Sequence, residues 1–108
     1  MGKQYRVIMP PAAKQSLREI VEYIKKDSPS AASKVRKRLF EVVGSLNKLP
    51  ERFSKEILLD QKNGNYRSVT IWHFKIVYQI LENEVLILKF IHTSINPSKL
   101  KQLIRKDG

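Results

Sequence analysis

Cysteine is absent from this chain of 108 residues. Its absence excludes a disulfide framework, a thiolate metal site and a cysteine nucleophile. It also fits a reducing compartment, so we expect a cytoplasmic protein. Hydrophobic residues still make up 42% of the chain, which is enough to build a core without a metal or a cross-link. The length predicts a single domain over residues 1–108.

Long apolar runs are also missing. No segment has the length of a signal-peptide core or approaches the roughly 20 apolar residues of a membrane-spanning helix, so we expect no membrane partner. The chain has no glycine-rich phosphate loop and no nucleophile elbow. Its two histidines, His73 and His92, are too far apart in sequence to form a metal motif. We therefore expect no cofactor and no metal.

Acidic residues are scarce relative to basic ones. Twenty-one Lys and Arg face ten Asp and Glu, which gives a formal charge of +11 and a pI near 10.1. Such an excess costs self-repulsion in the folded state and suggests a polyanionic or acidic partner. No acid occurs between Glu84 and Asp107, where the basic residues are Lys89, Lys99, Lys101, Arg105 and Lys106.

The first half of the chain has helical periodicity. Residues 4–9 are typical of a short strand, which Pro10 and Pro11 end. Apolar residues then recur at helical spacing through Ile24, which predicts an amphipathic helix with Pro11 in its first turn. A second such stretch runs from Ala32 to Leu46, with Ser28 as the expected N-cap and Pro29 at the first helical position. The short connection predicts an antiparallel helical hairpin.

The second half has strand periodicity. We expect strands over Arg52–Leu59, Tyr66–Trp72, Phe74–Leu81 and Val85–Ile91, the last of them central in the sheet. Within the third of these, residues 74, 76, 78 and 80 should share one face and residues 75, 77 and 79 the other. Trp72 and Tyr78 are large enough that packing in the core is expected. A short basic helix should follow Pro97.

This order predicts an α+β fold, β-α-α-β-β-β-β, in which the helical hairpin covers one face of a mostly antiparallel sheet. The ordered set of residues also resembles the RelE/ParE superfamily of toxins, particularly its ParE-like members. The resemblance covers roughly residues 4–97. It rests on Tyr5–Ala13, on Leu17–Ala32, on Leu46–Phe53 with its Leu-Pro-x-Arg-Phe segment, on Tyr66-Arg67, on Phe74–Tyr78 and on Val85–His92.

The resemblance implies the toxin of a type II toxin–antitoxin pair, as found in plasmid stabilisation modules. Such a toxin would be neutralised by a cognate antitoxin, in a heterotetramer or as a homodimer with the antitoxin. Its target would be DNA gyrase in the ParE-like branch or mRNA in the ribosome in the RelE-like branch. The length of the helical hairpin favours gyrase inhibition, with the helices as an interaction surface. A ribosome-dependent mRNA endoribonuclease and a degenerate, non-toxic, antitoxin-binding relative are the alternatives.

For the ribonuclease branch, the resemblance points to Arg67, Lys75 and His92 as catalytic residues acting without a metal. Cationic groups would stabilise charge on the scissile phosphate, and an acid and a base would move protons. The residues expected to contact a nucleic acid or another target are Arg52, Arg67, His73, Lys75, Lys89, Lys99 and Lys101.

Two positions depart from the superfamily pattern. Val69 occupies a position where a second basic residue is expected in its strand, and residues 93–96 contain no arginine. One missing charge-stabilising donor costs about 10²–10³ in rate, which weakens the ribonuclease interpretation. The register of the hairpin also matters. A two-residue turn at Trp72-His73 would place Arg67 and Lys75 on opposite faces of the sheet, whereas an odd-numbered turn or a bulge would place them on the same face.

Overall fold

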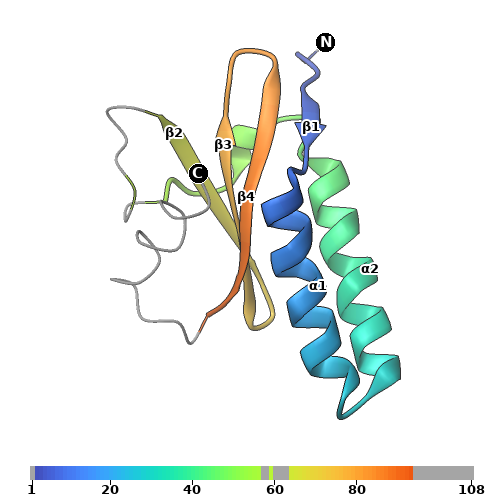
Figure 1. Ribbon diagram of the computed structural model, residues 1–108. Coiled ribbons are helices and arrows are strands. Elements are labelled where there is room, and N and C mark those ends of the chain that lie inside the picture. The colour runs from blue at the N-terminus through green and yellow to red at the C-terminus, as the bar shows by residue number, and fades with distance from the viewer. Residues whose placement is uncertain (1, 57–58, 60–63, 94–108) are drawn as a thin grey trace.

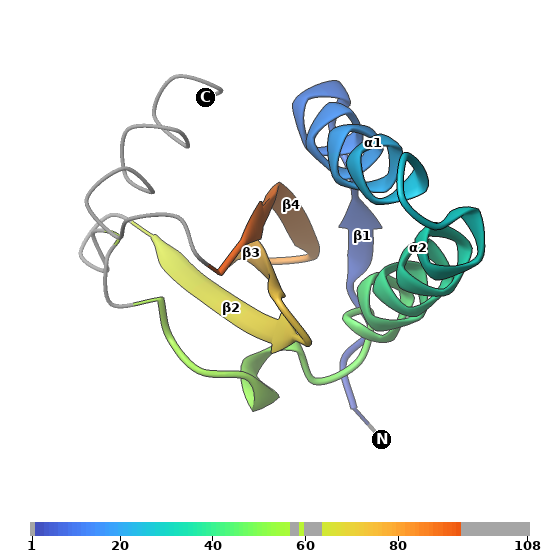
Figure 2. The same cartoon turned by 90° about the horizontal axis from the view of Figure 1, so that it is seen from below.

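The computed structural model describes residues 2–56, 59 and 64–93. Its elements are β1 (Arg6–Ile8), α1 (Pro11–Lys25), α2 (Pro29–Ser45), the 3₁₀ turn η1 (Pro50–Arg52), β2 (Asn65–Ile71), β3 (Phe74–Ile80) and β4 (Glu84–His92). Both helices lie side by side on one face of the sheet (Figures 1 and 2). The expected α+β class and the helical hairpin on one sheet face are confirmed. Neither described helix has the length and apolar content that crossing a bilayer requires.

The ends of the helices follow from local chemistry. Pro11 and Pro29 occupy first-turn positions, where the missing N–H costs no hydrogen bond. The Ser28 hydroxyl accepts the amide of Ala31 and caps α2, as expected. Each helix turns an apolar stripe inward. The buried residues of these stripes include Ala13 and Leu17 on α1, and Leu39, Val42 and Val43 on α2.

The sheet has the order β1-β4-β3-β2. β1 pairs with β4 in parallel, and the other two pairings are antiparallel. The pairing of Ile71 with Phe74 leaves Trp72 and His73 as a two-residue turn between β2 and β3. β4 carries a bulge at Leu88, because Val77 pairs with Lys89 while Tyr78 pairs with Ile87. β4 is a central strand, as the sequence predicts.

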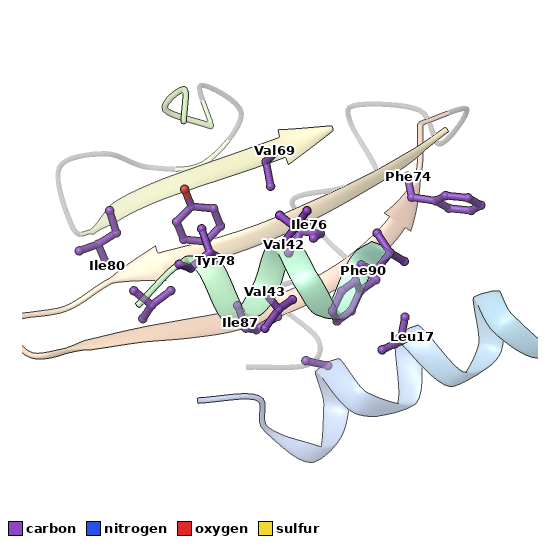
Figure 3. Close-up of a cluster of buried hydrophobic side chains, with 14 residues drawn as sticks. Leu17, Val42, Val43, Val69, Phe74, Ile76, Tyr78, Ile80, Ile87 and Phe90 are labelled. Atoms are coloured by element: carbon purple, nitrogen blue, oxygen red, sulfur yellow. The ribbon is translucent and has the colours of Figure 1, made fainter. Parts of the chain in front are cut away.

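The main core lies between the helices and one face of the sheet. Phe74, Ile76, Tyr78 and Ile80 of β3 line it, and Figure 3 shows several of them beside Val42, Val43 and Leu17. Tyr78 is fully buried, and its hydroxyl donates to the Pro50 carbonyl at 2.6 Å. Burial raises the pKa of Tyr78 to about 12. The alternation predicted for β3 and the core position of Tyr78 are confirmed.

A smaller cluster forms on the opposite face of the sheet. Leu59, Val77 and Ile91 are buried there, with Tyr66 and Leu88 packed against them. Glu56 is also buried, with only 3% of its surface exposed. Both faces of β3 are thus covered, which explains why Val77 is as inaccessible as Ile76.

Two sequence-based expectations are wrong in detail. The described part of Arg52–Leu59 forms no extended strand: η1 ends at Arg52, and Lys55 makes one isolated bridge to Arg67. Pro50 starts this turn, and Leu49 adopts a left-handed conformation before it. Trp72 is 59% exposed rather than in the core, because it lies in the turn between β2 and β3. The turn residues 60–63 and the basic helix expected after Pro97 lie outside the described residues.

Candidate functional site

Arg67 connects the edge strand β2 to the segment that follows α2. Its Nη1 donates to the carbonyls of Glu51 and Phe53, both at 2.9 Å, and its Nε donates to Asn65 Oδ1 at 3.0 Å. Charge-assisted bonds of this kind are among the stronger ones in proteins. Much of the hydrogen-bonding capacity of this guanidinium is therefore used within the protein, where it holds the η1 segment against the sheet.

Arg52 has a comparable role at the end of α2. Its guanidinium donates to the carbonyl and the Oγ of Ser45, the last residue of α2, at 3.3 Å and 2.6 Å, and to the Lys48 carbonyl beyond the helix at 2.7 Å. It also lies 4.6 Å from the centre of the Phe53 ring. The last carbonyls of a helix lack intrahelical donors, and a cation there also suits the helix dipole. Arg52 thus stabilises the C-terminal end of α2.

Lys75 lies on the opposite face of the sheet from Arg67. Lys75 pairs with Thr70, whereas Arg67 pairs with Tyr78, whose ring is in the main core. The sequence left two registers open, and the two-residue turn is the one observed. Lys75 Nζ forms an ion pair with the buried Glu56 carboxylate at 2.8 Å. Arg67 and Lys75 therefore do not converge on one site.

The two histidines lie together at the end of the sheet where β3 begins and β4 ends. Their rings are stacked with centroids 6.0 Å apart and 15° between the planes. Phe74 meets the His92 ring edge-on at 5.5 Å. Among the residues that the structure describes, no three His, Cys, Asp or Glu side chains are placed to hold a metal ion.

A groove runs along the last part of β4, between that strand and α1. β1 pairs with β4 only as far as Leu86, and beyond it α1 approaches the strand. The buried Ser16 Oγ accepts the amide of Phe90 at 3.0 Å and donates to the Ala13 carbonyl. The groove has a volume of about 600 Å³, and its lining comprises Ser16, Glu19, Ile20, Tyr23, Ile24, Phe74, Lys89, Phe90, Ile91 and His92. We name it the α1–β4 groove.

The α1–β4 groove brings together some predicted site residues and several that the sequence analysis missed. Lys89 and His92 line it, and His73 stacks on His92 at its margin. Tyr23, which is 72% exposed in the structure, was not singled out in the sequence analysis. Ser16 was the available sequence signal. A serine within the apolar stripe of α1 suggests that this face of the helix meets a backbone group of a strand edge, as it does at Phe90. Lys99 and Lys101 lie outside the described residues.

The chain matches known proteins in sequence pattern and in fold. The family model described as "ParE toxin of type II toxin-antitoxin system, parDE" matches residues 7–97. The structure of a chromosomal ParDE toxin–antitoxin system from P. aeruginosa superposes with a TM-score of 0.68 at 19% identity, covering 84% of this chain and 98% of that one. The RelBE2 toxin–antitoxin complex from Mycobacterium tuberculosis gives a TM-score of 0.55 at 22% identity, covering 83% and 92%.

No curated protein sequence matches the chain. At these identities the two structures establish the likeness of the fold, whereas the family model covers most of the chain. The expected membership of the RelE/ParE superfamily is thereby confirmed. The chain belongs to the ParE toxin family of type II toxin–antitoxin systems.

Proposed function

We propose that this toxin is bound and neutralised by a cognate antitoxin and that, when released, it stops growth by inhibiting DNA gyrase. Membership of the ParE family supports this target over the ribosome. The helical hairpin would then serve as a binding surface, and the sheet would serve as its support.

The observation that carries the proposal is the set of contacts that the cationic side chains of the sheet make. An RNA-cleaving site requires donors aimed at one scissile phosphate. Here Arg67 is bonded to the carbonyls of Glu51 and Phe53, and Lys75 is paired with Glu56 on the opposite face. Inhibition of a target by binding needs no such convergence, so this arrangement favours a gyrase inhibitor over a nuclease.

The α1–β4 groove is the site that we propose for the antitoxin. Its lining is mainly apolar; Tyr23 is exposed on α1, and the partly exposed Lys89 of β4 contributes a cation. An amphipathic, acidic segment could place apolar side chains in the groove and a carboxylate near Lys89. The net charge of +11 favours such a partner. The two structurally similar systems, ParDE and RelBE2, are toxin–antitoxin systems, which agrees with this proposal.

Induced expression without the antitoxin tests the target. We expect growth arrest with a DNA-damage response and intact mRNA, and we expect the purified toxin to block supercoiling by gyrase in vitro. Early mRNA cleavage with active gyrase would overturn the proposal. Unimpaired growth at a high level of folded protein would support the degenerate, non-toxic relative instead.

One observation favours the ribonuclease as a second candidate. The stacked His73 and His92 rings are two groups able to exchange protons, and they lie within one site. If the toxin cleaves mRNA, His73→Gln and His92→Gln should each reduce cleavage while leaving the protein folded. Arrest that persists in both variants would remove this candidate.

A further inference from the structure

The highest local density of positive charge among the described residues lies on one turn of α2. Lys34, Arg36, Lys37 and Arg38 are all exposed, and only Val35 between them packs towards the core. Arg38 approaches Glu41 at 3.4 Å. Among the residues that the structure describes, no acidic side chain pairs with Lys34 or Lys37. We call this turn the α2 basic turn.

The four cations point in different outward directions. Because a helix turns by about 100° per residue, Arg36 and Arg38 lie on opposite flanks and Lys37 lies on the crest between them. Arg36 stacks on the Phe40 ring at 4.7 Å and lines the outer groove between the two helices with Lys14 and Arg18. Figures 1 and 2 show α2 at the outer margin of the molecule, where no strand covers it.

We propose that the α2 basic turn binds the phosphate backbone of double-stranded DNA, with α2 lying along the major groove. That groove is about 12 Å wide and admits an α-helix, with phosphates on both of its walls. Cations on both flanks of one helix match two walls of phosphates better than they match one extended acidic chain. DNA carries one negative charge per about 1.7 Å of its axis, so one turn of α2 meets several phosphates.

An acidic polypeptide fits this surface less well. Protein partners derive most of their affinity from apolar and aromatic anchors seated in pockets. The α1–β4 groove offers such a lining with an exposed tyrosine, whereas Phe40, the aromatic residue beside the α2 basic turn, is stacked against Arg36. Binding to the phosphate backbone needs no apolar anchor. The proposal goes beyond gyrase inhibition and does not depend on it.

The test is the salt dependence of binding to a mixed-sequence 20-base-pair DNA duplex, followed by fluorescence anisotropy. Lys34→Gln/Lys37→Gln removes two charges from the α2 basic turn, and Lys3→Gln/Lys55→Gln removes two from elsewhere. Both double variants have the same net charge, and the Lys→Gln changes within α2 preserve helix propensity. Circular dichroism checks that each variant is folded.

We expect the wild-type protein to bind the duplex with a steep salt dependence. Lys34→Gln/Lys37→Gln should reduce the slope of log K against log salt by about 1.8, since each lost phosphate contact removes about 0.9. The control double variant should change the slope by much less.

No binding at low salt, or an equal loss in both variants, would overturn the proposal. Stronger binding to poly-glutamate than to DNA, lost with the same two lysines, would assign the turn to an acidic protein instead. Because the assay uses only toxin and DNA, a failure of gyrase inhibition leaves its result unaffected.

Discussion

Lys75 and Glu56 form an ion pair that connects β3 to the segment before β2. Only 4% of the Glu56 side chain is exposed, compared with 23% of Lys75. Breaking such a pair costs more than forming it gains, because a charge is left in a poorly hydrated site. Lys75 therefore has a structural role, and loss of toxicity on its substitution would not by itself identify a catalytic group.

Lys75→Met should lower the free energy of unfolding by about 2 kcal/mol, less than the roughly 3–5 kcal/mol of fully buried pairs because Lys75 retains some contact with water. Adding Glu56→Gln removes the negative charge that Lys75 neutralised and keeps an amide for hydrogen bonding, so more than half of the loss should be recovered. Urea denaturation measures both effects. A double variant no more stable than Lys75→Met would show that the pair is not the source of the loss.

Tyr78 provides a pH-dependent test of the core. Its pKa is raised to about 12 from 10.0 by burial, while Arg67 and Arg52 lower it. A raised pKa in the folded state means that the stabilisation from this group is complete below pH 10 and is lost as pH rises towards 12.

Tyr78→Phe should lower stability at neutral pH by about 1–2 kcal/mol, because the Pro50 carbonyl loses its donor. It should also flatten the decline in stability above pH 10. Denaturation midpoints between pH 8 and about 11.5 would measure this effect. An unchanged alkaline slope in Tyr78→Phe would mean that another group controls the decline.

The residue types at the site could be predicted, but their contacts could not. The sequence shows that Arg52, Arg67 and Lys75 are cationic residues in expected strands that also contain aromatic residues. It does not show that the two arginines bond to backbone carbonyls, because those carbonyls belong to Lys48, Glu51 and Phe53, in the irregular segment around η1, and no periodic pattern predicts the path of that segment.

At the scale of elements, the turn between β2 and β3 contains a strained residue. Trp72 has φ of 55°, in the left-handed region that glycine adopts without cost. Two-residue hairpin turns favour glycine or asparagine where φ is positive. Because an exposed tryptophan occupies a position that is costly for its backbone, we predict that its side chain contacts a partner.

Trp72→Gly should therefore stabilise the folded protein by about 0.5–1 kcal/mol, since relief of about 1–2 kcal/mol of left-handed strain exceeds the added backbone entropy. The same variant should lose growth inhibition or antitoxin affinity. Thermal denaturation tests the predicted stabilisation, and the growth assay tests the predicted loss of function. A destabilised Trp72→Gly protein would show that the indole packs usefully on the hairpin.

The helices and the two faces of β3 could be predicted because their signals are local, whereas the register of β3 against β2 could not. Pro11, Ser28 and Pro29 specify helix starts, and the alternation of β3 specifies its faces. The parallel pairing of β1 with β4 and the bulge at Leu88 depend on contacts between distant segments. No local pattern encodes them, and the bulge shifts the facing of β4 by one residue.

For the whole molecule, the charge of +11 and the α1–β4 groove lead to one expectation about stability. An antitoxin that binds only the folded toxin must stabilise it by mass action. Neutralisation of repelling cations should make this effect stronger at low salt. The toxin alone should correspondingly gain stability as salt rises.

An antitoxin present at about 100 times its dissociation constant should add about 2.7 kcal/mol and raise the Tm by roughly 10 °C. Tyr23→Ala should abolish most of this rise, because a buried interface tyrosine contributes about 2 kcal/mol or more. Phe40→Ala, outside the groove, is the matched control and should keep it. Differential scanning fluorimetry of each toxin with and without antitoxin measures the shift. An undiminished shift in Tyr23→Ala, with a diminished one in Phe40→Ala, would move the antitoxin from the α1–β4 groove to the outer face of the hairpin. It would then compete with DNA for the α2 basic turn.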